Sequence, residues 1–130
     1  LALTSNDGSK DFQTIKAHDS LYFFEKVLTT AKTWGTVDQL MFVVGATKAE
    51  ELKHIRNIIP DHFLLVPGVG AQGGSLEDVC RFGMNNKCGL LVNSSRNIIY
   101  ASNGKDFGIK AGEEAKKIKV QMTEYLNRYI

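Results

Sequence analysis

The chain has 130 residues, of which 43% are hydrophobic and 23% are charged, and its 16 basic and 14 acidic residues nearly balance. This composition fits one soluble globular domain, and the near-neutral charge argues against a nucleic-acid partner. No apolar run reaches the roughly eighteen residues of a transmembrane helix, and no signal peptide is recognisable. We therefore expect a cytoplasmic protein without a membrane partner.

Runs of apolar residues predict four short strands, each followed by a loop and a helix. The expected strands cover residues 1–5, 40–44, 63–66 and 88–93. The expected helices begin near positions 19, 47, 75 and 111 and end near positions 35, 59, 84 and 129. Because the chain begins within the first strand, we expect it to be a fragment of a longer protein.

Polar residues indicate how these helices begin. Asp19 or Ser20 can cap the first helix, and Thr47 with Glu50 three residues later forms a capping-box pattern for the second. Arg56 falls on the polar face of the second helix. The second helix is therefore predicted to be an ordinary amphipathic helix.

The cysteines and histidines do not form a metal-binding pattern. Cys80 and Cys88 lie eight positions apart, and the three histidines are scattered at positions 18, 54 and 62. This spacing is not that of a zinc site, so we expect no metal ion and two buried free thiols, as in a reducing compartment. The basic run at 116–119 is expected to be a solvated helix face.

Four consecutive strand-loop-helix units indicate an α/β fold with a parallel sheet and right-handed crossovers. Polar or glycine-rich segments follow the carboxyl ends of the expected strands, at residues 5–6, 46–47, 68–74 and 95–96. Ligands of α/β proteins bind at this edge. The four units form either a small open sheet or half of an eight-stranded barrel.

The most distinctive stretch is the glycine-rich loop after the third strand, which includes Gly70 and Gly73. Such a loop has little side-chain bulk, so its backbone N–H groups can approach an anion closely. In (β/α)8 barrels a phosphate is commonly held by the loops after strands seven and eight. Counted from the C-terminus, the glycine loop follows the penultimate strand, and Ser95 and Arg96 follow the last. Both segments would then face one phosphate group.

A dinucleotide site is the alternative interpretation of this loop. Residues 68–73 satisfy the G-x-G-x-x-G pattern, and Ser94, Ser95 and Arg96 could receive the 2′-phosphate of NADP. Against it, Pro67 occupies the tight turn, two complete units precede the loop, and only one helix follows the fourth strand. The barrel explains more of the pattern.

Three stretches carry a resemblance to a known family: V-P-G-V-G-A-Q-G-G at 66–74, L-V-N-S-S-R-N-I-I-Y-A at 91–101, and L-A-L-T-S-N-D-G-S at 1–9 with D-F-Q at 11–13. They resemble the orotidine 5′-phosphate decarboxylases, in the bacterial subgroup with longer chains, although Asp7 stands where that family more often has proline. The resemblance implies that residues 1–130 are one segment, the C-terminal half of a TIM (β/α)8 barrel with about strands 5–8. It also implies a carbon–carbon lyase of pyrimidine synthesis that converts orotidine 5′-monophosphate to uridine 5′-monophosphate and CO2 without a cofactor.

The same resemblance assigns roles to individual residues. Gln72 would bridge the phosphate and the pyrimidine ring from a mobile loop, and Arg96 would pair with the phosphate. The backbone N–H groups of Ser95 and Arg96 would assist, and Ser5 would hydrogen-bond the pyrimidine edge. A glutamine amide both donates and accepts, and a guanidinium fork suits a dianion, so these residue types fit the roles.

The catalytic residues of the family are not expected in this chain. The resemblance implies an Asp-Lys-Asp-Lys network in the missing N-terminal half, marked by D-x-K-x-x-D, with one aspartate from the partner subunit of a homodimer. No D-x-K-x-x-D occurs in residues 1–130. We therefore expect the isolated chain to bind phosphate and base but to be inactive. A non-catalytic module for phosphorylated nucleotides and a fragment of an NADP-linked oxidoreductase remain as alternatives.

Overall fold

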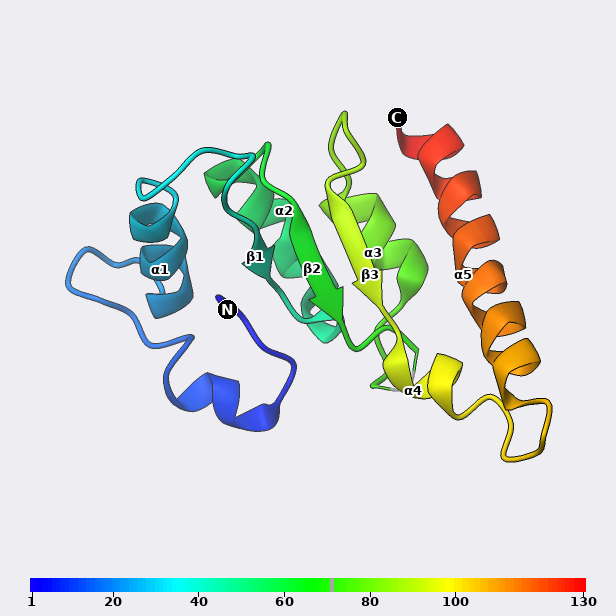
Figure 1. The fold of residues 1–130 in the computed structure, drawn as a ribbon. Coiled ribbons are helices and arrows are strands. Elements are labelled where there is room, and N and C mark those ends of the chain that lie inside the picture. The colour runs from blue at the N-terminus through cyan, green and yellow to red at the C-terminus, as the bar shows by residue number, and fades with distance from the viewer. Residues whose placement is uncertain (71) are drawn as a thin grey trace.

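The computed structural model describes residues 1–70 and 72–130, and its centre is a three-stranded parallel sheet. The strands β1 (Phe42–Val43), β2 (Leu64–Pro67) and β3 (Leu90–Asn93) lie side by side in chain order (Figure 1). In register, Val43 pairs with Leu65, and Leu65 pairs with Leu91. The predicted parallel α/β arrangement is therefore confirmed.

The first predicted strand is reduced to a single parallel bridge. Leu3 pairs with Val44 on the edge of β1 that faces away from β2, and two backbone hydrogen bonds hold it there. Ala2 N donates to Val43 O at 3.1 Å, and Gly45 N donates to Leu3 O at 2.8 Å. Four parallel positions thus follow one another across the sheet in chain order.

The helical segments alternate with the strands. They are η1 (Asp7–Asp11), α1 (Phe23–Ala31), η2 (Ala46–Lys48), α2 (Ala49–Ile58), α3 (Leu76–Gly83), α4 (Ser95–Ile99) and α5 (Phe107–Tyr129). Helices α2 and α3 cover one face of the sheet (Figure 1). No helix within the described residues combines the length and apolarity needed to cross a membrane.

The hydrophobic core lies between the sheet and these helices. Alternate strand residues point into it, namely Phe42, Val44, Leu64, Val66 and Leu90, and all of them are buried. Helices α2 and α3 contribute Leu52, Ile55, Val79 and Cys80. The opposite face of the sheet is open, and Leu91 there is 47% exposed. Apolar residues on both faces of a strand are typical of strands that are covered on both sides.

Three predicted helix starts are wrong for local reasons. Helix α1 begins at Phe23, because Ser20 has a positive φ of 64° and the carboxylate of Glu25 receives the Tyr22 N–H instead. The capping box of Thr47 with Glu50 does not form, since 46–48 make a 3-10 turn and α2 follows without a side-chain cap among the described residues. Helix α5 begins at Phe107, earlier than predicted.

The place of Arg56 on the polar face of α2 predicts a solvated side chain, and this prediction is wrong. Its guanidinium is half-buried and donates to backbone carbonyl oxygens at the amino ends of β2 and β3 and at the end of α3. The three shortest hydrogen bonds reach His62 O at 2.6 Å, Gly83 O at 2.7 Å and Gly89 O at 2.8 Å. Burial lowers the pKa of Arg56 to about 10, which leaves it charged at neutral pH.

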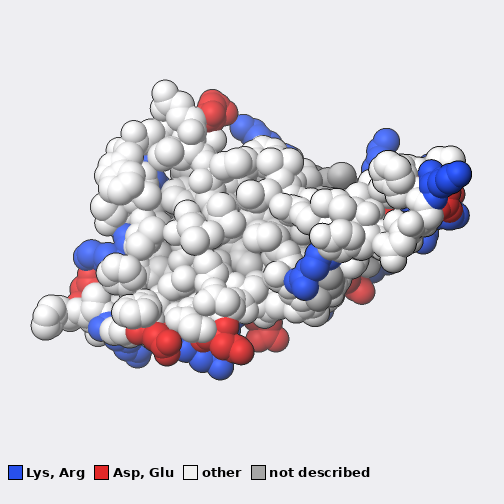
Figure 2. Space-filling model, turned by 60° about the horizontal axis from the view of Figure 1, so that its bottom comes forward, with Lys and Arg blue, Asp and Glu red and all other residues white. Residues whose placement is uncertain are grey.

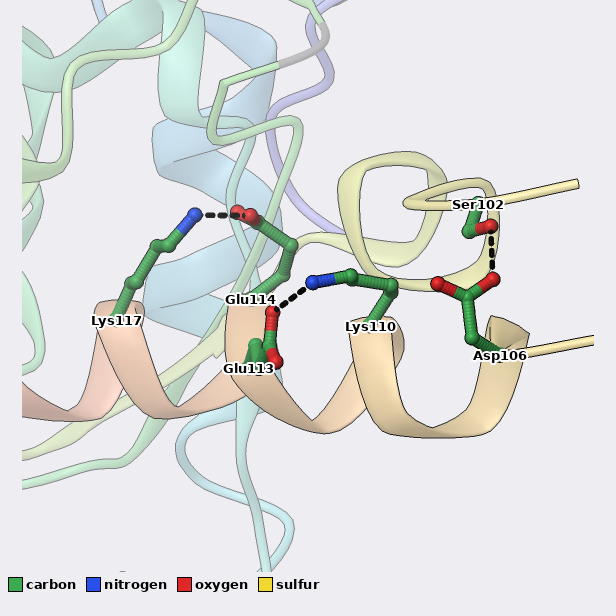
Figure 3. A network of polar contacts seen from close by, with 6 residues as sticks. All are labelled: Ser102, Asp106, Lys110, Glu113, Glu114 and Lys117. Atoms are coloured by element: carbon green, nitrogen blue, oxygen red, sulfur yellow. Dashed lines mark hydrogen bonds and ion pairs between the residues drawn. The ribbon is translucent and has the colours of Figure 1, made fainter. Parts of the chain in front are cut away.

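The surface of α5 carries short-range polar contacts (Figure 3). Lys110 Nζ lies 2.9 Å from Glu113 Oε2, and Lys117 pairs with Glu114. Exposed pairs of this kind contribute little to stability. Helix α5 is held instead by partly buried apolar side chains that pack against the core, namely Met122, Tyr125 and Tyr129. The lysines at 116, 117 and 119 are exposed, as expected.

His62 is a buried titratable residue just before β2. It is 7% exposed, its ring meets Phe42 edge-on with centroids 5.3 Å apart, and neither ring nitrogen has a hydrogen-bond partner among the described residues. Burial lowers the pKa of His62, and the nearby cations Arg56 and Lys32 add to this while Asp61 opposes it. The folded chain therefore holds this imidazole neutral.

This burial predicts a loss of stability in mild acid. The unfolded histidine has a pKa near 6.5, so below about that pH the unfolded chain binds more protons than the folded chain. Above about pH 6.5, His62 should not make the free energy of unfolding depend on pH. At lower pH, His62 should decrease the free energy of unfolding by at most about 1.4 kcal/mol per pH unit. Urea unfolding at several pH values should show this slope. His62→Phe should reduce the slope, whereas the exposed His18→Phe should leave it; equal slopes in both variants would contradict the prediction.

Candidate functional site

The glycine loop after β2 folds back on itself. Gly68, Gly70 and Gly73 have φ values of +95°, +76° and +85°, which only glycine adopts without strain. Gly70 N donates to Gly74 O at 2.9 Å, Gly73 N to Gly70 O at 2.7 Å, and Gly74 N to Gly68 O at 3.2 Å. In this conformation the N–H groups of Gly70 and Gly73 therefore donate within the loop rather than outward to a ligand. Ala71 lies outside the described residues.

The loops after β2 and β3 enclose a small pocket at the carboxyl ends of the strands. Its volume is about 100 Å³, and it is lined by Pro67, Gly68, Val69, Gln72, Asn93, Ser94, Ser95 and Arg96. Sites that enclose a whole small molecule usually measure roughly 300–1,000 Å³, so this pocket fits one small group. The structure thus brings together Gln72, Ser95 and Arg96, which come from the two segments that the sequence analysis expected to face each other.

The polar groups of the pocket come from both of its sides. The Gln72 amide folds back over Gly68, since a Cβ on that glycine would collide with Gln72 Oε1. Arg96 is exposed, and no carboxylate in the described part of the chain forms an ion pair with it. An amide and a charged guanidinium at one pocket can together bind an anion.

Two residues of this pocket, Asn93 and Ser94, were given no role in the phosphate site that the barrel interpretation predicted. Asn93 ends β3, and its Oδ1 accepts a 2.8 Å hydrogen bond from Ser95 Oγ. Ser94 is 5% exposed, and its Oγ donates to Val69 O at 3.0 Å. A serine directly before a helix usually signals a cap. No pattern in the sequence predicted the contact of Ser94 with a loop 25 residues earlier.

Ser5 lies outside the pocket, at the end of the neighbouring N-terminal segment. Its side chain points at the backbone after β1, because a Cβ on Gly45 would collide with Ser5 Oγ. The hydroxyl is buried and has no hydrogen-bond partner among the described residues. A buried polar atom without a partner is unusual, and a ligand is one explanation for it.

The face at the carboxyl ends of the strands carries little charge at its centre. In the view that brings the carboxyl ends of the strands forward, charged side chains gather around the edge of the face and leave its centre almost free of them (Figure 2). Among residues 1–70 and 72–130, no three His, Cys, Asp or Glu side chains are grouped so as to hold a metal ion. The candidate site is therefore defined by a guanidinium, amide groups and hydroxyls.

The fold and the site together define part of a TIM barrel with a small polar-lined pocket at the carboxyl ends of its strands. No family model matches the chain. It is 61% identical over 122 residues to the orotidine 5′-phosphate decarboxylase of Porphyromonas gingivalis, covering 94% of this chain and 44% of that protein. It is 58% identical over 127 residues to the enzyme of that name from Flavobacterium johnsoniae, covering 98% of this chain and 46% of that protein.

Solved structures agree with these relatives. The Leishmania donovani OMP decarboxylase superposes with a TM-score of 0.73 at 31% identity, over 94% of this chain and 46% of that one. A Toxoplasma gondii structure described as a putative orotidine-monophosphate-decarboxylase has a TM-score of 0.77 at 24% identity, over 99% of this chain and 51% of that one, which shows the fold alone. The resemblance of the sequence is therefore confirmed: the chain is a homologue of the orotidine 5′-phosphate decarboxylases and spans about half the length of the relatives it matches.

Proposed function

We propose that this chain is the phosphate- and base-binding half of an orotidine 5′-phosphate decarboxylase. The complete enzyme would convert orotidine 5′-monophosphate to uridine 5′-monophosphate and CO2. The observation that carries this proposal is the pocket at which Gln72, Ser95 and Arg96 meet. Its size suits the phosphate group of a nucleotide and not the whole nucleotide, so the base would lie outside it.

The proposed half is the C-terminal one, with residues 1–130 as a single segment that supplies about strands 5–8. Support comes from the order of the four parallel positions, which are the Leu3 bridge and β1 to β3. The pocket lies between the loops after the third and the fourth of these. In TIM barrels the loops after strands seven and eight frequently bind phosphate.

Each proposed binding residue has a physical reason. The Arg96 guanidinium would bind the phosphate through charge-assisted hydrogen bonds, aided by the backbone N–H groups of Ser95 and Arg96. The Gln72 amide, whose Oε1 already lies over Gly68 at the start of the loop, would bridge the phosphate and the pyrimidine ring. The unpartnered hydroxyl of Ser5 would bond the pyrimidine edge. A role for the amides of Gly70 and Gly73 requires the loop to exchange its internal hydrogen bonds for bonds to the ligand.

The open face of the sheet supports the proposal that another half-barrel is missing. Val43, Leu65 and Leu91 form an apolar row across it, and Leu91 is 47% exposed. In a closed barrel such inward-pointing residues are packed in layers. The missing half would also bring the Asp-Lys network, and the complete enzyme would be a cytoplasmic homodimer. The free thiols of Cys80 and Cys88 fit a reducing compartment.

One experiment tests binding and chemistry separately. We expect the isolated chain to bind uridine 5′-monophosphate in a calorimetric titration and to release no CO2 from orotidine 5′-monophosphate. Adding the other half of a homologous barrel as a separate polypeptide should restore turnover. Decarboxylation by the chain alone would contradict the division of roles.

The titration also separates the alternatives. NADPH should bind more weakly than uridine 5′-monophosphate, because the pocket admits only a small group. Binding of uridine 5′-monophosphate without turnover in the completed barrel would favour a non-catalytic module. Preference for NADPH would favour the oxidoreductase fragment.

A further inference from the structure

Ser94 lies between the two loops that line the pocket, and its hydroxyl joins them. The residue is 5% exposed, and its Oγ donates a 3.0 Å hydrogen bond to the carbonyl oxygen of Val69. Val69 is itself 6% exposed. Because a carbonyl oxygen only accepts, the hydroxyl must be the donor. The contact therefore ties the glycine loop to the end of β3.

The peptide group between Val69 and Gly70 is held at both ends. Its carbonyl oxygen accepts from Ser94, and its N–H donates to Gly74 O at 2.9 Å. Because a peptide group is planar, fixing both polar ends fixes its orientation. Asn97 lies within α4 and covers Gly70 so closely that a Cβ there would collide with Asn97 Nδ2. The loop is thus held by Ser94, directly before α4, and by Asn97 within it.

In the described part of the chain, the hydroxyl of Ser94 does not cap α4, although serine usually caps a helix from this position. Ser94 directly precedes α4, and its carbonyl oxygen accepts from Ile98 N at 3.2 Å. A serine here usually caps the helix by accepting a backbone N–H with its hydroxyl oxygen. Within the part of the chain that the structure describes, Ser94 makes no such bond. Its side chain serves the contact between the loops instead.

We propose that Ser94 is a positioning residue that fixes the glycine loop, through the Val69–Gly70 peptide group, relative to the segment that carries Arg96. Without the hydroxyl, the loop should move away from α4, and Gln72 would no longer face the same pocket as Arg96. The consequence for ligand binding rests on the proposed function, whereas the contact between the loops does not.

The first test measures the loop without a ligand. Ser94→Ala removes the hydroxyl, Ser94→Thr keeps it, and Ser102→Ala is a matched control that loses a 2.7 Å hydrogen bond to Asp106 before α5 (Figure 3). The Gly70 amide should exchange with solvent roughly fivefold faster in Ser94→Ala, as expected for the loss of one ordinary hydrogen bond. Ser94→Thr and Ser102→Ala should match the unsubstituted chain.

The second test measures binding of uridine 5′-monophosphate by calorimetry. Affinity should fall about fivefold or more in Ser94→Ala, recover in Ser94→Thr and be unchanged in Ser102→Ala. A lowered melting temperature with unchanged Gly70 exchange and unchanged affinity would overturn the proposal, since that is the result of a merely structural role. If the unsubstituted chain binds no uridine 5′-monophosphate, the proposed function fails, and the exchange measurement still decides the role of Ser94.

Discussion

Replacing Arg56 with methionine is expected to lower the free energy of unfolding by about 2 kcal/mol, taking about 1 kcal/mol for each of two carbonyl oxygens left without a donor. These two oxygens belong to His62 and Gly83 and lie 2.6 and 2.7 Å from the guanidinium nitrogens, whereas Gly89 O, the third acceptor at 2.8 Å, keeps its hydrogen bond from Leu64 N. Methionine has a similar length and can fill the space, but it donates no hydrogen bond. The amino ends of β2 and β3 would then lose the group that joins them.

Urea unfolding of the chain measures this effect, and α2 itself offers the control. Lys53 is exposed on the same helix, so Lys53→Met should change the free energy of unfolding by no more than about 0.5 kcal/mol. Arg56→Lys should fall between the two, because one ammonium group cannot reach carbonyl oxygens that lie in different directions. Equal midpoints for Arg56→Met and Lys53→Met would show that the carbonyl oxygens are satisfied by water instead.

Arg56 also shows where reasoning from the sequence reaches its limit. The helical periodicity of α2 placed Arg56 on the polar face, away from the core. Two of the carbonyl oxygens that it binds, on Gly83 and Gly89, lie 27 and 33 residues away along the chain. No local pattern records such a contact. The strands were predictable because each is a continuous apolar run. The glycine loop was predictable because its glycines are close together in the sequence, and three of them have a positive φ in the structure.

The residues of the pocket also differ in how far the sequence could predict their roles. Gln72 and Arg96 could be proposed from their residue types and their places after two strands, since parallel strands bring their carboxyl ends to one edge. The contact of Ser94 could not be predicted, because its hydroxyl bonds Val69 O, 25 residues earlier in the chain, and no local pattern records such a bond. The helix starts predicted at Ser20 and Thr47 failed because neither residue caps its helix: Ser20 has a positive φ, and α2 begins without a side-chain cap among the described residues.

The exposed guanidinium of Arg96 is expected to account for much of the affinity for a nucleotide monophosphate. Arg96→Ala should weaken binding of uridine 5′-monophosphate by roughly tenfold to a hundredfold, the range of one charge-assisted hydrogen-bonding group. Arg96→Lys should recover part of the affinity, because it restores the charge but not the planar fork. The stability of the chain should not change, since Arg96 is exposed and forms no ion pair with a carboxylate in the described residues.

Calorimetry with two ligands separates the phosphate from the base. Uridine lacks the phosphate, so its binding, however weak, should be the same for Arg96→Ala and the unsubstituted chain. Lys116→Ala removes an exposed positive charge from α5, outside the pocket, and should leave the binding of both ligands unchanged. An equal loss of affinity in Lys116→Ala and Arg96→Ala would mean that net charge attracts the nucleotide. A loss confined to Arg96→Ala and to the phosphorylated ligand would instead assign the phosphate to the pocket between the loops after β2 and β3.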